Sequence, residues 1–336
     1  MPASPGSVLP MNSNPFPAHD QQHESRTGPG PLVVKRPEDL LAFVPLAIGF
    51  TPERSVVMLT FDGRGSSFHA RVDLPAEIDD VDDLVETLLA PARRHRVSSV
   101  IFVIYDDDTV VADESAWSLH ESFGAAGIAV TDVLRAHEGM WFAVLPGRPR
   151  EHYAGVSFDV STHPFTARGV FEGRVTHRSR EDLRASLAPR PDEVEETVAA
   201  LCTAAPLPES EVRALVLGAL HGDPLAAPDL ARLALALASP SARDEAWSWL
   251  TRSQARAAAD LWSDVVRRVP TTHVAAPAAV LAMAAWLAGE GALAWCAVDR
   301  CREVEPQHSL ATLVAGLLES AASPEVWHEL RPDPAA

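Results

Sequence analysis

The chain has 336 residues, of which 47% are apolar and 22% are charged. This length predicts two domains, because single domains usually hold roughly 100 to 200 residues. The formal charge is −18 at pH 7, from 46 acidic and 28 basic side chains. Such a field repels phosphate backbones and anionic lipid, so we expect no nucleic-acid partner. The acid excess either keeps an alanine-rich protein soluble or forms a surface for a basic partner.

Cysteine usage and the apolar segments predict a cytoplasmic protein. Cys202, Cys296 and Cys301 cannot all pair and show no Cys-x-x-Cys spacing, so we expect structural thiols in a reducing compartment. Residues 1–31 lack the charged and apolar regions of a signal peptide. The longest apolar stretch, residues 274–288, is shorter than the ~20 residues of a membrane span. We therefore expect no membrane partner.

The N-terminal region begins with a tail and leads into a buried strand. Residues 1–31 contain seven prolines and almost no large apolar residue, which predicts a disordered tail. Residues 37–44 predict a helix with proline at its start, and residues 45–52 predict a turn. Residues 55–61 are almost continuously apolar, as is typical of a strand covered on both faces.

The following segments complete an α/β domain over residues 32–163. Residues 67–74 alternate apolar and polar side chains, which predicts a hairpin with the preceding strand. The remaining expected elements are a helix at 79–95, a strand at 99–105, a helix at 111–126 and strands at 128–136 and 140–145. The order ββαβαββ predicts a mixed β-sheet with packed helices. Residues 146–163 are expected to be irregular.

Beyond residue 163 every periodic segment is helical, so residues 164–330 are predicted to form an all-α domain. Ala282, Ala294 and Pro306 match the small, small and proline positions of one tetratricopeptide-like helix pair. A single match in an alanine-rich segment leaves two interpretations, a helical repeat or a helical bundle docked on the sheet.

A turn ahead of the first strand is the first candidate ligand site. It holds Gly49, Phe50 and Pro52 and is followed by Ser55. Glycine permits a ligand to approach the backbone closely, and the serine hydroxyl can donate a hydrogen bond. The alternative is a rigid corner between helix and strand, since Gly and Pro are ordinary turn residues.

The second candidate is the polar side of the strand over residues 67–74. His69, Arg71 and Asp73 have a period of two and therefore face the same way. Arg71 would bind a carboxylate or a phosphate, and Asp73 would orient it. The alternative is a solvated hairpin face with an ion pair along the strand.

Aspartates form the remaining candidates. Asp106 begins a run of three directly after a buried strand, where α/β sheets often bind ligands and carboxylates can hold Mg²⁺. The alternative is a loop that caps the next helix.

Asp132 lies among apolar residues, which predicts a buried carboxylate with a raised pKa, or one that pairs with an arginine such as Arg71. Arg243 and Asp244 predict a salt bridge between domains or a helix cap.

Several catalytic classes lack the residues that they need. Lys35 is the sole lysine and lies at the edge of the tail, so no Walker A, kinase or Schiff-base lysine is available. The chain has no Gly-x-Gly-x-x-Gly, Gly-x-Ser-x-Gly or His-Glu-x-x-His motif. We therefore expect no cofactor and no metal.

Three runs of residues carry a resemblance to a known family. They are Asp39-Leu40-Leu41-x-x-Val44-Pro45, Gly49-Phe50-x-Pro52-x-x-Ser55-Val56-Val57 and Ala70-Arg71-Val72-Asp73-Leu74-Pro75. Together with Arg243-Asp244 and the segment 285–309, they resemble the uncharacterised actinobacterial family labelled domain of unknown function 4192, over about residues 32–327. The resemblance implies no established activity.

The expected function is open between two classes. The first is a non-enzymatic cytoplasmic binding or regulatory protein, which engages a protein partner through its C-terminal helices or binds a small anionic ligand. The alternative is an enzyme that acts on a small anionic or nucleotide-like substrate at the strand ends, with Arg71, Asp73, Asp106 and Ser55. A concave site lined by Arg71 and Asp73 would favour a ligand, whereas a purely structural scaffold would lack one.

Overall fold

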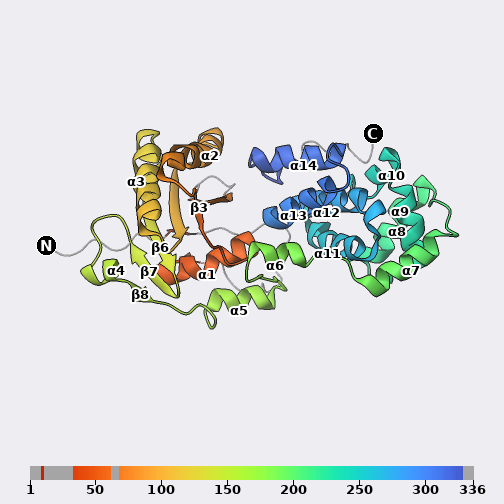
Figure 1. The fold of residues 1–336 in the computed structure, drawn as a ribbon, viewed down its shortest axis with the longest axis horizontal. Helices are drawn as coiled ribbons and strands as arrows, with labels where there is room; N and C mark the ends of the chain where they lie inside the picture. The colour runs from red at the N-terminus through yellow and green to blue at the C-terminus, as the bar shows by residue number, and fades with distance from the viewer. Residues whose placement is uncertain (1–8, 11–32, 62–67, 328–336) are drawn as a thin grey trace, which may run out of the picture. The chain divides into compact units, whose positions relative to one another are not determined.

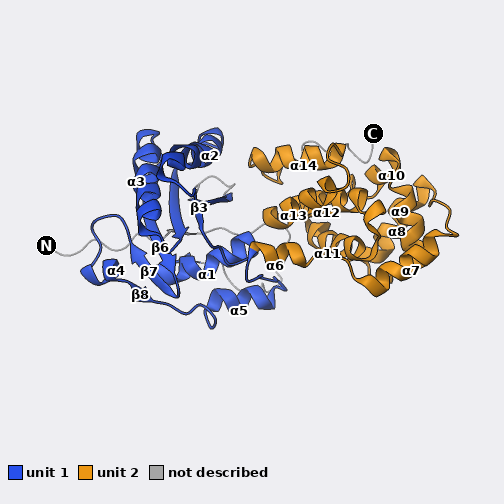
Figure 2. Ribbon diagram, viewed as in Figure 1, with its two compact units in different colours: residues 1–179 blue, residues 180–336 orange. Residues whose placement is uncertain are grey.

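The computed structural model describes residues 9–10, 33–61 and 68–327. The chain divides into two units, residues 1–179 and residues 180–336 (Figure 2). The predicted disordered tail lies outside the described residues except for β1 (Leu9–Pro10), which pairs antiparallel with β2 (Val33–Val34).

The first unit holds a mixed six-stranded sheet (Figure 1). Its strands are β3 (Ser55–Phe61), β4 (His69–Asp73), β5 (Ser99–Tyr105), β6 (Ala129–His137), β7 (Met140–Ala143) and β8 (Val156–Ser157). Their order across the sheet is β4-β3-β5-β6-β7-β8, and in this sheet only β5 and β6 are parallel neighbours. The predicted ββαβαββ order is confirmed. β8 lies in the segment predicted to be irregular, because a strand of two residues shows no alternation.

Helices cover both faces of this sheet (Figure 1). α2 (Val81–Arg94) and α3 (Thr109–Ala125) pack on one face, in a core that contains Phe102. α1 (Pro37–Ile48) packs on the other face, in a core that contains Val103. Because both faces are covered, β3 and β5 are apolar on both sides, which explains their continuous apolar runs.

α1 is longer than the sequence predicts. The turn expected over residues 45–52 begins only at Gly49, which caps the helix with a left-handed φ of 88°. Pro45 lies inside the helix and has no N–H group, but its carbonyl accepts from the Gly49 amide at 2.9 Å. The missing hydrogen bond is tolerated because the buried side of the helix is well packed, with Leu41 and Val44 in the core.

Two short helices, α4 (Arg150–Ala154) and α5 (Pro164–Phe171), complete the first unit. α5 contacts α1, and a Cβ at Gly169 would lie only 2.4 Å from a methyl carbon of Leu46. Glycine therefore allows the two helices to approach closely. The segment that follows residue 163, expected in the helical domain, thus belongs to the first unit, which ends at residue 179.

The second unit is helical throughout its described residues, as predicted. Its helices are α6 (Arg180–Ala185), α7 (Pro191–Leu201), α8 (Glu209–Leu220), α9 (Ala227–Ala236), α10 (Pro240–Glu245), α11 (Arg252–Arg268), α12 (Ala275–Ala288), α13 (Gly291–Arg302) and α14 (Ser309–Glu319). α12 contacts α11, α13 and α14, and nearly all of its side chains are buried. A helix that is apolar on every side needs such a central position. Among the described residues, no helix has both the length and the apolar character to span a membrane.

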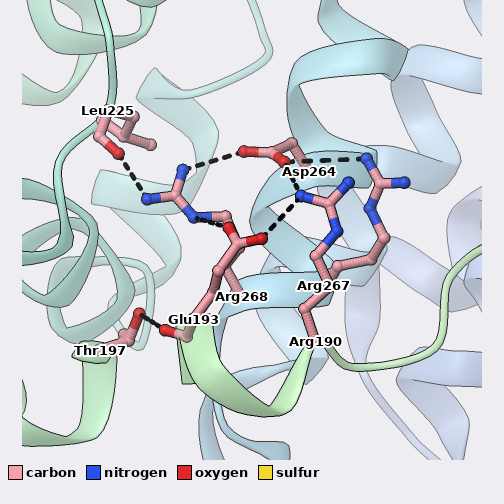
Figure 3. A network of polar contacts seen from close by, with 7 residues as sticks. All are labelled: Arg190, Glu193, Thr197, Leu225, Asp264, Arg267 and Arg268. Carbon is pink, nitrogen blue, oxygen red and sulfur yellow. Dashed lines mark hydrogen bonds and ion pairs between the residues drawn. The ribbon is translucent and has the colours of Figure 1, made fainter. Parts of the chain in front are cut away.

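A network of arginines and carboxylates joins α7 to α11 (Figure 3). Asp264 accepts hydrogen bonds from Arg190 at 3.1 Å and from Arg268 at 2.9 Å. Glu193 contacts the same two guanidinium groups, and Arg267 lies 3.7 Å from Asp264. Burial, together with the neighbouring Arg190, lowers the pKa of Arg267. Three positive and two negative groups therefore share this junction.

We expect Asp264→Asn to destabilise the second unit by about 1–2 kcal/mol. Hydrogen bonds to charged groups contribute roughly 1.5–3 kcal/mol each, and partial exposure reduces this figure. Urea denaturation at pH 7 measures the change. Asp260→Asn on the same helix is the matched control, because Asp260 is exposed and partial desolvation raises its pKa, so a neutral side chain should cost little there. Equal losses in the two variants would contradict the role given to the network.

Candidate ligand site at the strand ends

One row of side chains crosses the sheet at the carboxyl ends of β5 and β6. The paired residues are Asp73, Ser55, Tyr105, Ala136 and Trp141, on β4, β3, β5, β6 and β7 in turn. Paired residues of neighbouring strands point to the same face of a sheet. Trp141 belongs to the core that contains α1, so the whole row lies on the α1 face. Open α/β sheets commonly bind ligands at this end of their parallel strands.

Two hydroxyl groups in this row are buried without a hydrogen-bond partner. Ser55 is fully buried, and neither its Oγ nor the Tyr105 hydroxyl has a partner among the described residues. Burial raises the pKa of Tyr105 above its ordinary range, so the phenol keeps its proton and remains a donor. Because buried polar groups are nearly always hydrogen-bonded, these two hydroxyls are candidate donors to a ligand.

Arg71 lies on the same face of β4, two residues before Asp73. Its Nη2 forms an ion pair with Asp73 and donates to the Glu53 carbonyl at 3.4 Å, while its Nε is buried without a partner. The guanidinium carbon lies 5.8 Å from the centroid of the Phe50 ring. The ion pair along the strand is as predicted. The alternative of a solvated face is wrong for Arg71, whose side chain is only 15% exposed, because α1 contacts β4 on this side.

The turn after α1 forms a fixed corner beside Arg71. The Thr51 amide donates to the His177 carbonyl at 3.0 Å, and the His177 amide donates to the Gly49 carbonyl at 2.9 Å. Phe50 and Pro52 are both buried. The interpretation as a rigid corner therefore holds for this turn, and its contribution to the site is the Phe50 ring under the guanidinium.

His69 continues the polar side of β4 away from the strand ends. Its ring meets Phe43 of α1 edge-on, with 5.3 Å between the ring centroids. The Nδ1 atom is buried and has no partner among the described residues. Burial lowers the pKa of His69 to about 4, so the ring is neutral at pH 7 and adds no positive charge beside Arg71.

Asp106 follows Tyr105, but its carboxylate already accepts a hydrogen bond from its own loop. Its Oδ1 accepts from the Asp108 amide at 3.0 Å, and Asp108 in turn caps α3 by accepting from the Val110 amide at 2.9 Å. Of the three aspartates, Asp108 caps the helix, as the alternative interpretation expects, and Asp106 is held within the loop. Among the described residues, no group of three or more His, Cys, Asp and Glu side chains is placed to hold a metal ion.

Asp132 is largely buried, with 14% of its side chain exposed, and this burial raises its pKa, as predicted. Its partner is Arg148 and not Arg71, because β3 and β5 separate β6 from β4. The register of β5 and β6 shifts so that Val130 and Asp132 pair with consecutive residues of β5. This bulge leaves out Thr131 and moves Asp132 to the other face from Val130, a change that alternation in the sequence does not reveal.

Arg243 and Asp244 form a pair inside the second unit. Arg243 donates to Asp244 Oδ1 from Nε at 3.0 Å and from Nη2 at 2.8 Å, and its Nη1 donates to Ser309 Oγ at 3.1 Å. Trp247 Nε1 donates to the same carboxylate oxygen at 3.0 Å. These contacts tie α10 to the start of α14, so the expectation of a bridge between domains is replaced by a bridge between helices.

Tyr105 is a site residue that the sequence pattern did not predict. It ends a strand that is otherwise apolar, and the antiparallel pairing of β3 with β5 sets it opposite Ser55. A tyrosine at the last position of a buried strand was the available signal, because its hydroxyl needs a partner when it is buried.

The fold and the site together define a protein with an α/β unit that carries a polar site at its strand ends, followed by a helical unit. Residues 37–325 match the model of the family described as Domain of unknown function (DUF4192). The chain belongs to this family. No curated protein and no solved structure matches the chain.

Proposed function

We propose that the protein is a non-enzymatic cytoplasmic binding or regulatory protein whose first unit binds a small anionic ligand at the carboxyl ends of β5 and β6. The observation that carries this proposal is the pair of buried, unpartnered hydroxyls of Ser55 and Tyr105. They lie on the same face as the Arg71 guanidinium, whose Nε is also unpartnered. Hydroxyl and guanidinium donors together match the lone pairs of an anionic group.

Binding has more support than catalysis. A serine nucleophile needs a hydrogen-bonded base, and Ser55 has no such partner among the described residues. The raised pKa of Tyr105 also prevents the phenol from acting as a base near neutral pH. The alternative enzyme relies on Asp106, whose carboxylate already accepts from the Asp108 amide.

A protein partner on the C-terminal helices is a second proposal with less support. Val198, Val304 and Leu313 are the large apolar side chains that the described part of the second unit exposes. They lie on α7, directly after α13 and on α14. Single exposed apolar residues are normal on a protein surface.

We expect Tyr105→Phe to abolish ligand binding while it leaves the free protein nearly as stable as wild type. An anion at ~100 times its dissociation constant should add ~2.7 kcal/mol to wild type, and the variant lacks the donor that holds it. Without ligand the change should cost less than about 1 kcal/mol, because the lost hydroxyl has no partner. A thermal-shift screen against acetate, lactate, benzoate, succinate and inorganic phosphate measures both effects.

Tyr153→Phe is the matched control, since the chain has two tyrosines. The Tyr153 hydroxyl donates to the Leu145 carbonyl at 2.8 Å and accepts from the Arg148 amide at 3.1 Å. This variant should therefore lose about 1 kcal/mol of stability and keep the full ligand response. A ligand response that survives in Tyr105→Phe, or no response to any anion in wild type, would overturn the proposal.

A further inference from the structure

We infer that the strand-end site selects a carboxylate monoanion over a phosphate dianion. The inference rests on the proposed function and names the ligand class. Three groups on the α1 face are buried donors without a partner among the described residues: the Ser55 hydroxyl, the Tyr105 hydroxyl and the Arg71 Nε. A carboxylate presents two oxygens with about four lone-pair positions, so three donors suit one such group.

The charge of the site fits one negative charge. Arg71 is the cation on this face of β4, and its Nη2 is already paired with Asp73. His69 is neutral at pH 7 because burial lowers its pKa to about 4. Asp73 is 66% exposed, so solvent screening weakens its attraction to the guanidinium. The carboxylate therefore offsets only part of the Arg71 charge. The site therefore offers less than one full uncompensated positive charge, which is too little to offset the desolvation of a dianion.

The direction of α1 adds to this preference. α1 ends at Ile48 and is capped by Gly49, and the next residue, Phe50, contacts the Arg71 guanidinium. The carboxyl end of a helix carries roughly half a negative charge. Arg174 Nη1 donates to one of the last α1 carbonyls, that of Leu46, at 3.4 Å, and this positive charge offsets only part of the negative end. The negative end of α1 repels a ligand with one negative charge at Arg71 less than it repels a ligand with two.

The helix N-terminus at this end of the sheet belongs to α3 and lies on the face opposite α1. Phosphate sites commonly use the amide groups at a helix N-terminus. α3 begins directly after β5, at the same end of the sheet, but it packs on the opposite face. Its first amides are already capped, because Asp108 accepts from the amides of Val110 and Val111. The helix N-terminus next to this row therefore gives no support to a phosphate on the α1 face.

Isothermal titration at constant ionic strength tests the inference, with acetate, lactate, benzoate and succinate against inorganic phosphate and methyl phosphate at pH 8. We expect at least one monocarboxylate to bind wild type and Tyr153→Phe, at least tenfold tighter than either phosphate, and to lose this binding in Tyr105→Phe. A second variant, Arg71→Gln, should weaken the carboxylate by at least tenfold without unfolding the protein, since glutamine retains a hydrogen-bond donor.

Two other outcomes overturn the inference in distinguishable ways. If a phosphate binds as tightly as the best carboxylate, and Tyr105→Phe abolishes both, the site binds anions but does not select a monoanion. The proposed function then stands and the ligand class is wrong. If none of the six anions binds wild type, the proposed function fails and the inference fails with it.

Discussion

The free energy of unfolding of the first unit is expected to fall by about 3 kcal/mol between pH 6.5 and pH 4 through His69 alone. Burial lowers the pKa of His69 in the folded protein to about 4, against an ordinary value near 6.5. Between these two values the unfolded chain binds a proton that the folded chain does not. Unfolding is therefore favoured as the pH falls through this window. At about 1.4 kcal/mol for each pKa unit, the full loss is about 3 kcal/mol.

His69→Phe should remove this pH dependence. At pH 7 the change should cost about 1 kcal/mol or less, because the histidine is neutral, its Nδ1 has no partner and its ring already contacts Phe43. Urea denaturation, monitored by amide hydrogen exchange in β3 and β5, measures the free energy of unfolding of the first unit by itself. The raised pKa of Asp132 makes the folded protein more stable as the pH falls, which opposes the effect of His69. Wild type and His69→Phe share this contribution, so it cancels when their pH profiles are compared.

His221→Gln provides the control at an exposed histidine. This variant should lose stability between pH 6.5 and pH 4 as wild type does. If the free energy of unfolding of wild type and of His69→Phe changes in parallel between pH 6.5 and pH 4, burial does not lower the pKa of His69.

Trp262→Ala is expected to destabilise the second unit by about 3–5 kcal/mol. Trp262 lies on α11 and is fully buried, so alanine would lose the buried area of the indole and leave a cavity behind. α11 packs on α12, the central helix of this unit, which gives the surrounding side chains little freedom to fill the space.

Trp262→Phe separates packing from hydrogen bonding. The Trp262 Nε1 atom is buried without a partner among the described residues, so phenylalanine removes an unsatisfied donor while it keeps an aromatic ring in the core. We expect this variant to cost less than half as much as alanine. Urea denaturation of both variants gives the comparison, and equal losses would contradict the expectation that the aromatic ring, and not the indole N–H, carries the stability.

The sheet could be predicted from the sequence because its central strands have a strong signal. β3 and β5 span the predicted residues 55–61 and 99–105, since strands covered on both faces are continuously apolar. The length of α1 could not be predicted, because Pro45 reads as a stop and the packing that carries the helix to Ile48 is tertiary. The bulge that turns Asp132 is likewise set by pairing with β5.

The candidate site could be predicted only in part. Ser55, Arg71 and Asp73 were found from turn position and strand alternation, and the structure brings them to one end of one face. Tyr105 joins them only because β3 pairs antiparallel with β5 in one register, which no local pattern encodes. Asp106 was assigned to the same place because it follows the same strand, but its carboxylate accepts from the amide of its own loop.

The most direct test of the ligand site is to remove the Ser55 and Tyr105 hydroxyls one at a time and then together. The dissociation constant of the best-binding anion of the titration panel is measured for wild type, Ser55→Ala, Tyr105→Phe and the double variant. If both hydroxyls hold one ligand, Ser55→Ala weakens binding by at least fivefold, and neither Tyr105→Phe nor the double variant binds it measurably. Dissociation constants that stay at the wild-type value in all three variants would show that the ligand binds elsewhere and that the buried hydroxyls have no part in it.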